Sequence, residues 1–148
     1  MMRLLTRNQS RRLDQVSMEK LGIPGLMLME NAGKKVAEVT ESILEGNKRE
    51  KQIAICCGKG NNGGDGFSAA LHLDHFNVTI FSLPAISDIL GDSLHFYNKC
   101  VEKGMEIVHG CELPTSNEFD LIIDGLIGTG FSGEMRSPLK KWTKWINQ

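Results

Sequence analysis

The spacing of apolar residues predicts two helices in the first third of the chain. Thr6 and Gln9 fit a capping box, and apolar side chains follow at near-helical spacing at Leu13, Val16 and Leu21. Gly22 ends this helix, and Pro24 begins the next one. The second helix carries an apolar stripe made of Leu28, Ala32, Val36, Val39 and Ile43. Such a stripe must pack on another apolar surface.

After a polar turn at 46–51, short apolar runs alternate with helical segments. The run 53–57 has no polar alternation, which is typical of a strand buried on both faces of a parallel sheet. Further strands are predicted at 78–81, 105–109 and 121–124, and helices at 67–76, 88–103 and 139–146. Because strands and helices alternate, the fold class is α/β. We expect a Rossmann-like three-layer α/β/α arrangement with a mainly parallel sheet, in addition to the two N-terminal helices.

Composition narrows the class of protein. The 148 residues have the length of one domain, and 41% hydrophobic with 24% charged residues is normal for a soluble globular protein. Seventeen basic and eighteen acidic residues leave a formal charge of -1, which favours neither nucleic acid nor membrane partners. No apolar run approaches the roughly 18 residues of a membrane span, and the first residues lack the apolar core of a secretory signal. We therefore expect a cytoplasmic protein.

The cysteines do not predict a metal or redox site. The four of them, at positions 56, 57, 100 and 111, show no C-x-x-C or Cys/His pattern. Small buried thiols are the expected interpretation. Glycine is the informative residue type, because nine of the 16 glycines gather in two places, each directly after a predicted strand. In open α/β folds, ligands bind beyond the carboxyl ends of the strands.

The first glycine cluster spans residues 58–66, between a buried strand and a helix. Converging backbone N–H groups and a helix N-terminus would form a cradle for phosphate. Gly58, Gly60 and Gly63 satisfy the dinucleotide-binding fingerprint, but the second strand is not followed by the acidic residue that would hold the ribose. The alternative is a purely structural role, a tight turn in which Asn62 and Asp65 serve as local caps.

The second glycine cluster runs from Asp124 to Glu134. Asp124 ends an apolar strand, where its carboxylate can face a ligand or a cation, or can instead cap the segment that follows. Gly128, Thr129 and Gly130 add backbone amides to this edge of the sheet. Both clusters are therefore expected at one site.

Three segments resemble the signatures of the YjeF N-terminal domain, the NAD(P)HX epimerase family. They are residues 28–33 (LMENAG), 60–66 (GNNGGDG) and 124–130 (DGLIGTG). The resemblance implies epimerisation of the R and S forms of hydrated NADH and NADPH, a cofactor-repair reaction. It implies a functional link to an ATP- or ADP-dependent dehydratase that consumes the S form. It also implies a potassium ion held by Asn62 and Asp124, and substrate contacts from Asn61, Asn62, Gly63, Gly64, Asp65, Gly128, Thr129, Gly130, Phe131, Ser132, Gly133 and Glu134.

Several points stay open from the sequence. The proton carrier is not assigned among Asp65, Asp124 and groups outside the chain. The family's domain continues with a further strand and an Asp-x-Pro-Ser-Gly type segment, whereas this sequence ends at Gln148 and has no Pro-Ser-Gly. We therefore treat 1–148 as a domain without that C-terminal portion, which leaves a non-catalytic nucleotide-binding or scaffold module as the main alternative and a conventional NAD-dependent oxidoreductase as a weaker one. The stripe of the second helix predicts a homodimer or, equally, core packing.

Overall fold

A parallel sheet forms the centre of the molecule. The computed structural model describes residues 5–44, 46, 48–115 and 118–148. Within these ranges the sheet has four strands, β1 (Gln52–Cys57), β2 (Asn77–Ser82), β3 (Glu106–His109) and β4 (Leu121–Gly125). Their order is β3-β2-β1-β4, and every pairing is parallel. The predicted α/β class with a parallel sheet is confirmed.

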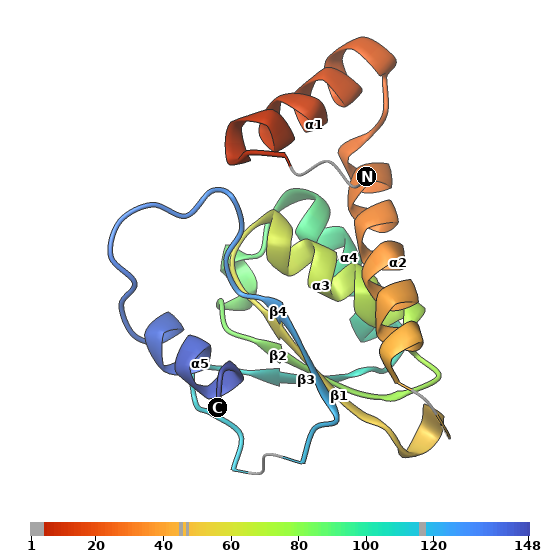
Figure 1. The fold of residues 1–148 in the computed structure, drawn as a ribbon, viewed down its shortest axis with the longest axis vertical. Helices are drawn as coiled ribbons and strands as arrows, with labels where there is room; N and C mark the ends of the chain where they lie inside the picture. The colour runs from red at the N-terminus through yellow and green to blue at the C-terminus, as the bar shows by residue number, and fades with distance from the viewer. Residues whose placement is uncertain (1–4, 45, 47, 116–117) are drawn as a thin grey trace.

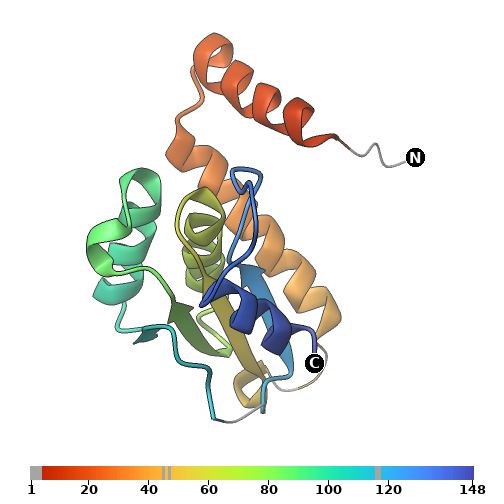
Figure 2. The same ribbon diagram turned by 90° about the vertical axis from the view of Figure 1, so that its left-hand side faces the viewer.

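Helices cover both faces of this sheet, as Figures 1 and 2 show. The helices α2 (Gly25–Ile43), α3 (Asn61–His72) and α4 (Gly91–Glu102) lie on one face, and α5 (Leu139–Ile146) lies on the other. Alternate residues of β1 follow this division: Ile53 and Ile55 belong to the core under α2 to α4, whereas Ala54 packs in the core that includes Trp142 of α5. Side chains of a strand point alternately to its two faces, so a strand covered on both sides must be apolar throughout.

The buried face of α2 differs from the predicted stripe. The residues that α2 buries are Met29, Gly33, Ala37 and Thr40, whereas the side chains of Val39 and Ile43 are 50% and 61% exposed. The reason is the close approach of α2 to α3. A Cβ on Gly33 would lie 2.4 Å from the Ser68 Oγ, so the face of α2 that meets its neighbour is made mostly of small residues together with Met29.

Helix α1 (Arg7–Leu21) stands apart from the sheet (Figure 1). The predicted capping box is present, because Gln9 N–H donates to Thr6 Oγ1 over 3.4 Å and Thr6 N–H donates to Gln9 Oε1 over 2.8 Å. Gly22 ends the helix with a φ of 66°. None of the residues of α1, all of them within the described part of the chain, is buried. No helix among the described residues is long and apolar enough to cross a bilayer.

Helix α3 begins earlier than the sequence predicts. Residues 61–66 were expected to form a loop before a helix at 67–76, but they make up the first turns of α3, which ends at His72. Likewise, α4 is shorter than the predicted 88–103 and follows a short 3-10 turn, η2 (Ile86–Asp88). The first glycine cluster is therefore mostly helical, and the loop proper is reduced to residues 58–60.

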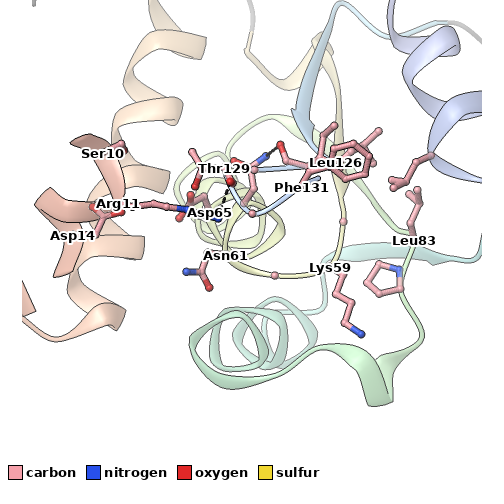
Figure 3. A pocket seen from close by; sticks show the side chains of 18 of the residues that line it. Ser10, Arg11, Asp14, Lys59, Asn61, Asp65, Leu83, Leu126, Thr129 and Phe131 are labelled. Carbon is pink, nitrogen blue, oxygen red and sulfur yellow. Dashed lines mark hydrogen bonds between the residues drawn. The ribbon is translucent and has the colours of Figure 1, made fainter. Parts of the chain in front are cut away.

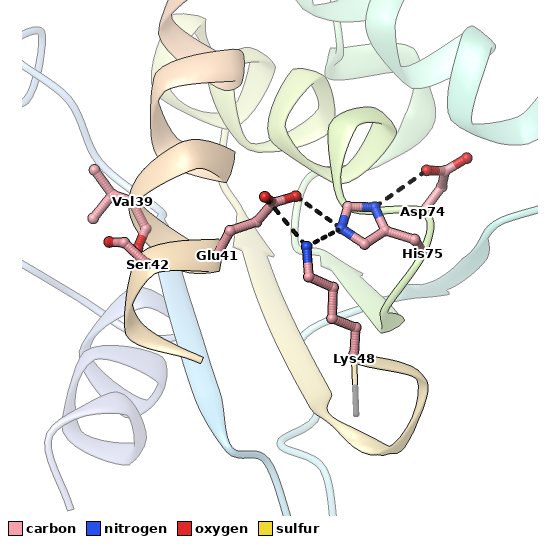
Figure 4. Close-up of polar contacts among 6 residues, drawn as sticks. All are labelled: Val39, Glu41, Ser42, Lys48, Asp74 and His75. Atoms are coloured by element: carbon pink, nitrogen blue, oxygen red, sulfur yellow. Dashed lines mark hydrogen bonds and ion pairs between the residues drawn. The ribbon is translucent and has the colours of Figure 1, made fainter. Parts of the chain in front are cut away.

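A polar network joins α2 to the start of β1 and β2, at the edge opposite the glycine clusters (Figure 4). The carboxylate of Glu41 contacts His75 Nε2 at 2.8 Å and Lys48 Nζ at 3.3 Å. Asp74 accepts from Lys103 and lies 3.7 Å from His75 Nδ1. These side chains are 37–44% exposed, so solvent screens the network, and each pair contributes at most about 1 kcal/mol.

Candidate functional site

The first loop, residues 58–60, connects β1 to α3 with almost no slack. Gly60 has a φ of 99°, which an L side chain rarely adopts. Gly58 touches the opposite loop, because a Cβ there would lie 1.8 Å from the main-chain oxygen of Leu126. A Cβ on Gly63 would lie 2.0 Å from the Gly58 oxygen. The glycines thus let α3 begin directly at the strand end, with its first backbone N–H groups free of intrahelical acceptors.

The second loop, residues 126–138, is tied to the first at the carboxyl edge of the sheet. Gly58 N–H donates to the Gly125 oxygen over 3.0 Å, and the Asn62 side-chain amide donates to the Ile127 oxygen over 3.1 Å. The Asp124 carboxylate accepts from the Leu126 N–H over 2.9 Å, so it caps the start of this loop. Sequence-distant glycine clusters therefore meet at one edge of the sheet.

Between the loops lies a cavity of about 950 Å³, toward the upper end of the usual range for small-molecule sites. Figure 3 shows its lining, with Ser10, Arg11 and Asp14 of α1 on one side and Asn61, Asp65 and Thr129 facing them. Arg11 Nη2 donates to the Thr129 oxygen over 2.8 Å. The cavity is thus walled by the two loops, the start of α3, one side of α1 and the segment after β2.

The residues that the sequence singles out divide into two groups. Those that line the cavity are Asn61, Asn62, Asp65, Gly128, Thr129, Gly130 and Phe131. The predicted residues outside the described lining are Gly63, Gly64, Asp124, Ser132, Gly133 and Glu134. The first two of these are buried where α3 packs closely, and the last three lie exposed farther along the second loop.

Sequence reasoning missed the contribution of α1. Its cavity-lining residues are Ser10, Arg11, Asp14, Gln15 and Met18. They belong to no motif. The sequence offered one indication: α1 has few apolar residues, while several polar residues lie on one side of the helix. A helix whose apolar side is too weak to pack in a core can instead contribute its polar side to a binding site.

Asp65 is electrostatically distinct among the residues of the cavity. Burial raises the pKa of its carboxyl to about 7, and the neighbouring Asp14 carboxylate contributes to the rise. A carboxyl with a pKa near 7 can both donate and accept a proton at neutral pH.

A second charged pair lies at the other rim of the cavity. Lys59 Nζ lies 4.0 Å from Asp88 Oδ1, and both side chains are mostly exposed.

The cysteines stay outside this chemistry. All four are free thiols, and Cys56, Cys57 and Cys100 are buried, as expected, whereas Cys111 is exposed. Burial raises the pKa of the Cys56 thiol to about 12, with a smaller contribution from Asp124. Such a thiol is protonated at neutral pH and is a poor nucleophile.

Comparison with known families agrees with this arrangement. The family described as YjeF-related protein N-terminus matches residues 25–148, which include both loops and α3. This chain belongs to that family. Helix α1, which precedes the matched residues, is the part of the cavity wall outside the match.

Individual relatives of this YjeF-related domain are similar over most of its length. It is 37% identical over 141 residues to an NAD(P)H-hydrate epimerase of Rhodopirellula baltica, covering 89% of this chain and 54% of that protein. It is 40% identical over 131 residues to a bifunctional NAD(P)H-hydrate repair enzyme of Archaeoglobus fulgidus, covering 88% of this chain and 26% of that protein. The chain thus spans about half of the first relative and a quarter of the second.

A solved structure supports the fold. The crystal structure of yeast ynu0, YNL200c, matches this YjeF-related domain with a TM-score of 0.82, covering 98% of this chain and 65% of the yeast chain. The sequence identity is 21%, so the likeness concerns the fold. It confirms the α/β architecture with two N-terminal helices.

Proposed function

We propose that this chain forms the site that interconverts the R and S epimers of hydrated NADH and NADPH. The observation that carries the proposal is the cavity at the carboxyl edge of the sheet, where both glycine-rich segments and Asp65 meet. The similarity to the Rhodopirellula protein, an NAD(P)H-hydrate epimerase, supports the same assignment.

Binding of a dinucleotide is supported by the start of α3. The first N–H groups of a helix attract phosphate, because they lack intrahelical acceptors and carry the positive end of the helix dipole. Asn61 and Asn62 stand at this helix start and line the cavity. Phe131, at the end of a turn in which its N–H donates to the Gly128 oxygen over 3.1 Å, offers an aromatic face at the far wall.

A potassium ion fits the oxygen donors at the same edge. The Asn62 amide nitrogen is engaged with Ile127, which leaves the amide oxygen available. One carboxylate oxygen of Asp124 accepts from Leu126, and the other remains for a cation. The two residues lie near each other, because a Cβ on Gly125, the neighbour of Asp124, would lie 3.0 Å from the Asn62 main-chain oxygen. Amide, carboxylate and carbonyl oxygens suit a hard cation, which when bound would neutralise phosphate charge. Asn62 and Asp124 would hold it.

The reaction breaks and re-forms one bond at the carbon that bears the hydroxyl group beside the ring nitrogen, and proton transfers assist both steps. Loss of that hydroxyl as water, or opening of the ring, gives a planar centre that can be rebuilt from either face. Acid catalysis promotes the departure of the hydroxyl, and fixed dipoles stabilise the charge that develops. A cavity with one partly buried carboxyl and many backbone amides provides both.

A coupled assay tests the proposal. An ATP- or ADP-dependent dehydratase in excess first removes the S form from a mixture of epimers, and the purified chain is then added to the remaining R form. We expect the R form to be consumed at a rate proportional to the concentration of the chain. Asn62→Ala should lose this activity, whereas Glu38→Gln, an exposed change on α2, should retain it. A rate equal to that without the chain would contradict the proposal.

The same assay together with a calorimetric binding titration separates the epimerase from a non-catalytic module of the same fold. If the chain binds the hydrated dinucleotide in a calorimetric titration but does not accelerate its epimerisation, it is a nucleotide-binding module. The absence of both binding and catalysis would favour a scaffold.

We place the chain in the cytoplasm, with a functional link to a dehydratase, and the bifunctional repair enzyme among the relatives supports such a link.

We also expect a homodimer, because Val39 and Ile43 leave an apolar strip of α2 uncovered. A monomeric mass by light scattering would contradict the dimer.

A further inference from the structure

We propose that Asp65 is the catalytic residue that carries the proton in this epimerisation, and that Asp14 of α1 is the positioning residue that tunes it. The inference rests on the proposed function and extends it to one atom pair, a carboxyl oxygen of Asp65 and the hydroxyl oxygen of the substrate. It also gives α1, which lies outside the family match, a role in the chemistry.

The geometry selects Asp65 over the other carboxylate that the sequence left open. Asp65 is half-buried on the second turn of α3 and lines the cavity. Asp124 is not among the described residues of the lining, and its carboxylate accepts from the N–H of Leu126. A proton carrier must reach the reacting atom, and of the two carboxylates it is Asp65 that lines the cavity, whereas the free oxygen of Asp124 is the one assigned to the cation.

The charges around the cavity explain how Asp65 can hold a proton at neutral pH. The charged side chains of the lining are Arg11, Asp14, Lys59, Asp65 and Asp88. Arg11 donates to a main-chain oxygen of the second loop, Lys59 lies 4.0 Å from Asp88, and among the described residues neither cation forms an ion pair with Asp65. Burial and the Asp14 carboxylate then raise the pKa of Asp65 to about 7. Burial is the larger cause, and a nearby carboxylate charge further disfavours ionisation of Asp65, which keeps it protonated.

The step balances without any co-reactant. Protonated Asp65 gives its proton to the substrate hydroxyl, the carbon–oxygen bond breaks with its electron pair on oxygen, and water leaves. The lone pair of the ring nitrogen forms a carbon–nitrogen double bond, which makes the centre planar. Water then attacks the opposite face, the nitrogen regains its lone pair, and the proton released from the attacking water passes to solvent, from which the Asp65 carboxylate is protonated again.

The test consists of two measurements in potassium buffer: the titration of the Asp65 carboxyl without substrate, and the pH dependence of the reaction rate with substrate. First, ¹³C-carboxyl NMR follows the titration of Asp65 in the intact chain. We expect a midpoint near 7, and a lower midpoint in Asp14→Asn, because one repelling charge is removed. The matched control is Glu19→Gln, the same charge change on the same helix at a residue whose carboxylate accepts from Gln15. It should leave the midpoint unchanged.

Second, the pH profile of the epimerisation rate is measured for the same proteins. Asp65→Asn should lower kcat by about 10²–10⁴-fold, the usual contribution of a general acid. Asp14→Asn should move the alkaline limb of the profile, where Asp65 loses its proton, to lower pH by the same amount as the NMR midpoint. A merely structural role of Asp14 would not produce this shift. Glu19→Gln should leave the profile in place.

The outcomes separate this inference from the proposed function. A wild-type chain that epimerises the substrate together with an equally active Asp65→Asn variant would overturn the inference and leave the function standing. An NMR midpoint near that of an exposed aspartate, about 4, would also overturn it. A wild-type chain that does not epimerise the substrate at all would overturn both.

Discussion

Replacing Gly58 by alanine tests how tightly the two loops are joined. The new Cβ would lie 1.8 Å from the main-chain oxygen of Leu126 and 2.6 Å from its carbonyl carbon. Nonbonded atoms need about 3 Å or more, so the loops must part by roughly 1 Å. The hydrogen bond from Gly58 N–H to the Gly125 oxygen, 3.0 Å long, would be stretched as a result. Overpacking costs about 1–3 kcal/mol and a lost buried hydrogen bond costs a similar amount, so we expect Gly58→Ala to lower the free energy of unfolding by about 3 kcal/mol.

Urea unfolding followed by tryptophan fluorescence measures this change, because both Trp142 and Trp145 are buried. The matched control is Gly130→Ala in the same cavity, where the nearest atom to the new Cβ would be Arg11 Nη2 at an ordinary 3.8 Å. Its free energy of unfolding should change by less than about 1 kcal/mol. If both variants lose the same stability, or if Gly58→Ala costs less than about 1 kcal/mol, the close contact between the loops is refuted.

Three further changes have outcomes fixed by the structure. Trp142→Ala empties a site that is 0% exposed and should lower the free energy of unfolding by about 3–5 kcal/mol in a urea titration. Folding raises the pKa of Asp65 from 3.8 to about 7. The free energy of unfolding of wild type therefore falls as the pH rises from about 4 to about 7, whereas Asp65→Asn, which cannot ionise, does not show this loss. The gain of the variant over wild type should reach about 2 kcal/mol near pH 8, after allowance for the exposed part, and vanish near pH 4. Arg11→Ala removes the hydrogen bond to Thr129 and should speed hydrogen exchange in α1 while leaving β1 protected.

Strand β1 was predictable because burial on both faces leaves a direct mark on the sequence. The apolar run of β1 and the glycines after it identified both the parallel sheet and the edge where the site lies. The helical state of residues 61–66 was not predictable from propensity. Glycine and asparagine disfavour helix interiors, but the close packing of α3 against the first loop, seen at Gly63, overrides that preference.

The parts of the site that the sequence could not reveal depend on contacts between distant segments. The buried side of α2 was displaced from its large apolar residues because Gly33 and Ser68 bring two helices into close contact. The distinct pKa of Asp65 arises from burial and from Asp14, a residue 51 positions earlier in the chain. Such proximity has no periodic signature, so α1 was predicted as a helix but not as a wall of the cavity.

Amide chemical-shift mapping with hydrated NADPH is the most direct test of the central claim, that the two loops and α1 enclose one dinucleotide site. Increasing ligand should perturb amides in residues 58–65, 126–131 and 10–18 together, with a single binding constant, and should leave those around the Glu41–His75 network unchanged. Perturbations that appear at only one of the two loops, or that centre on the opposite edge of the sheet, would contradict the account.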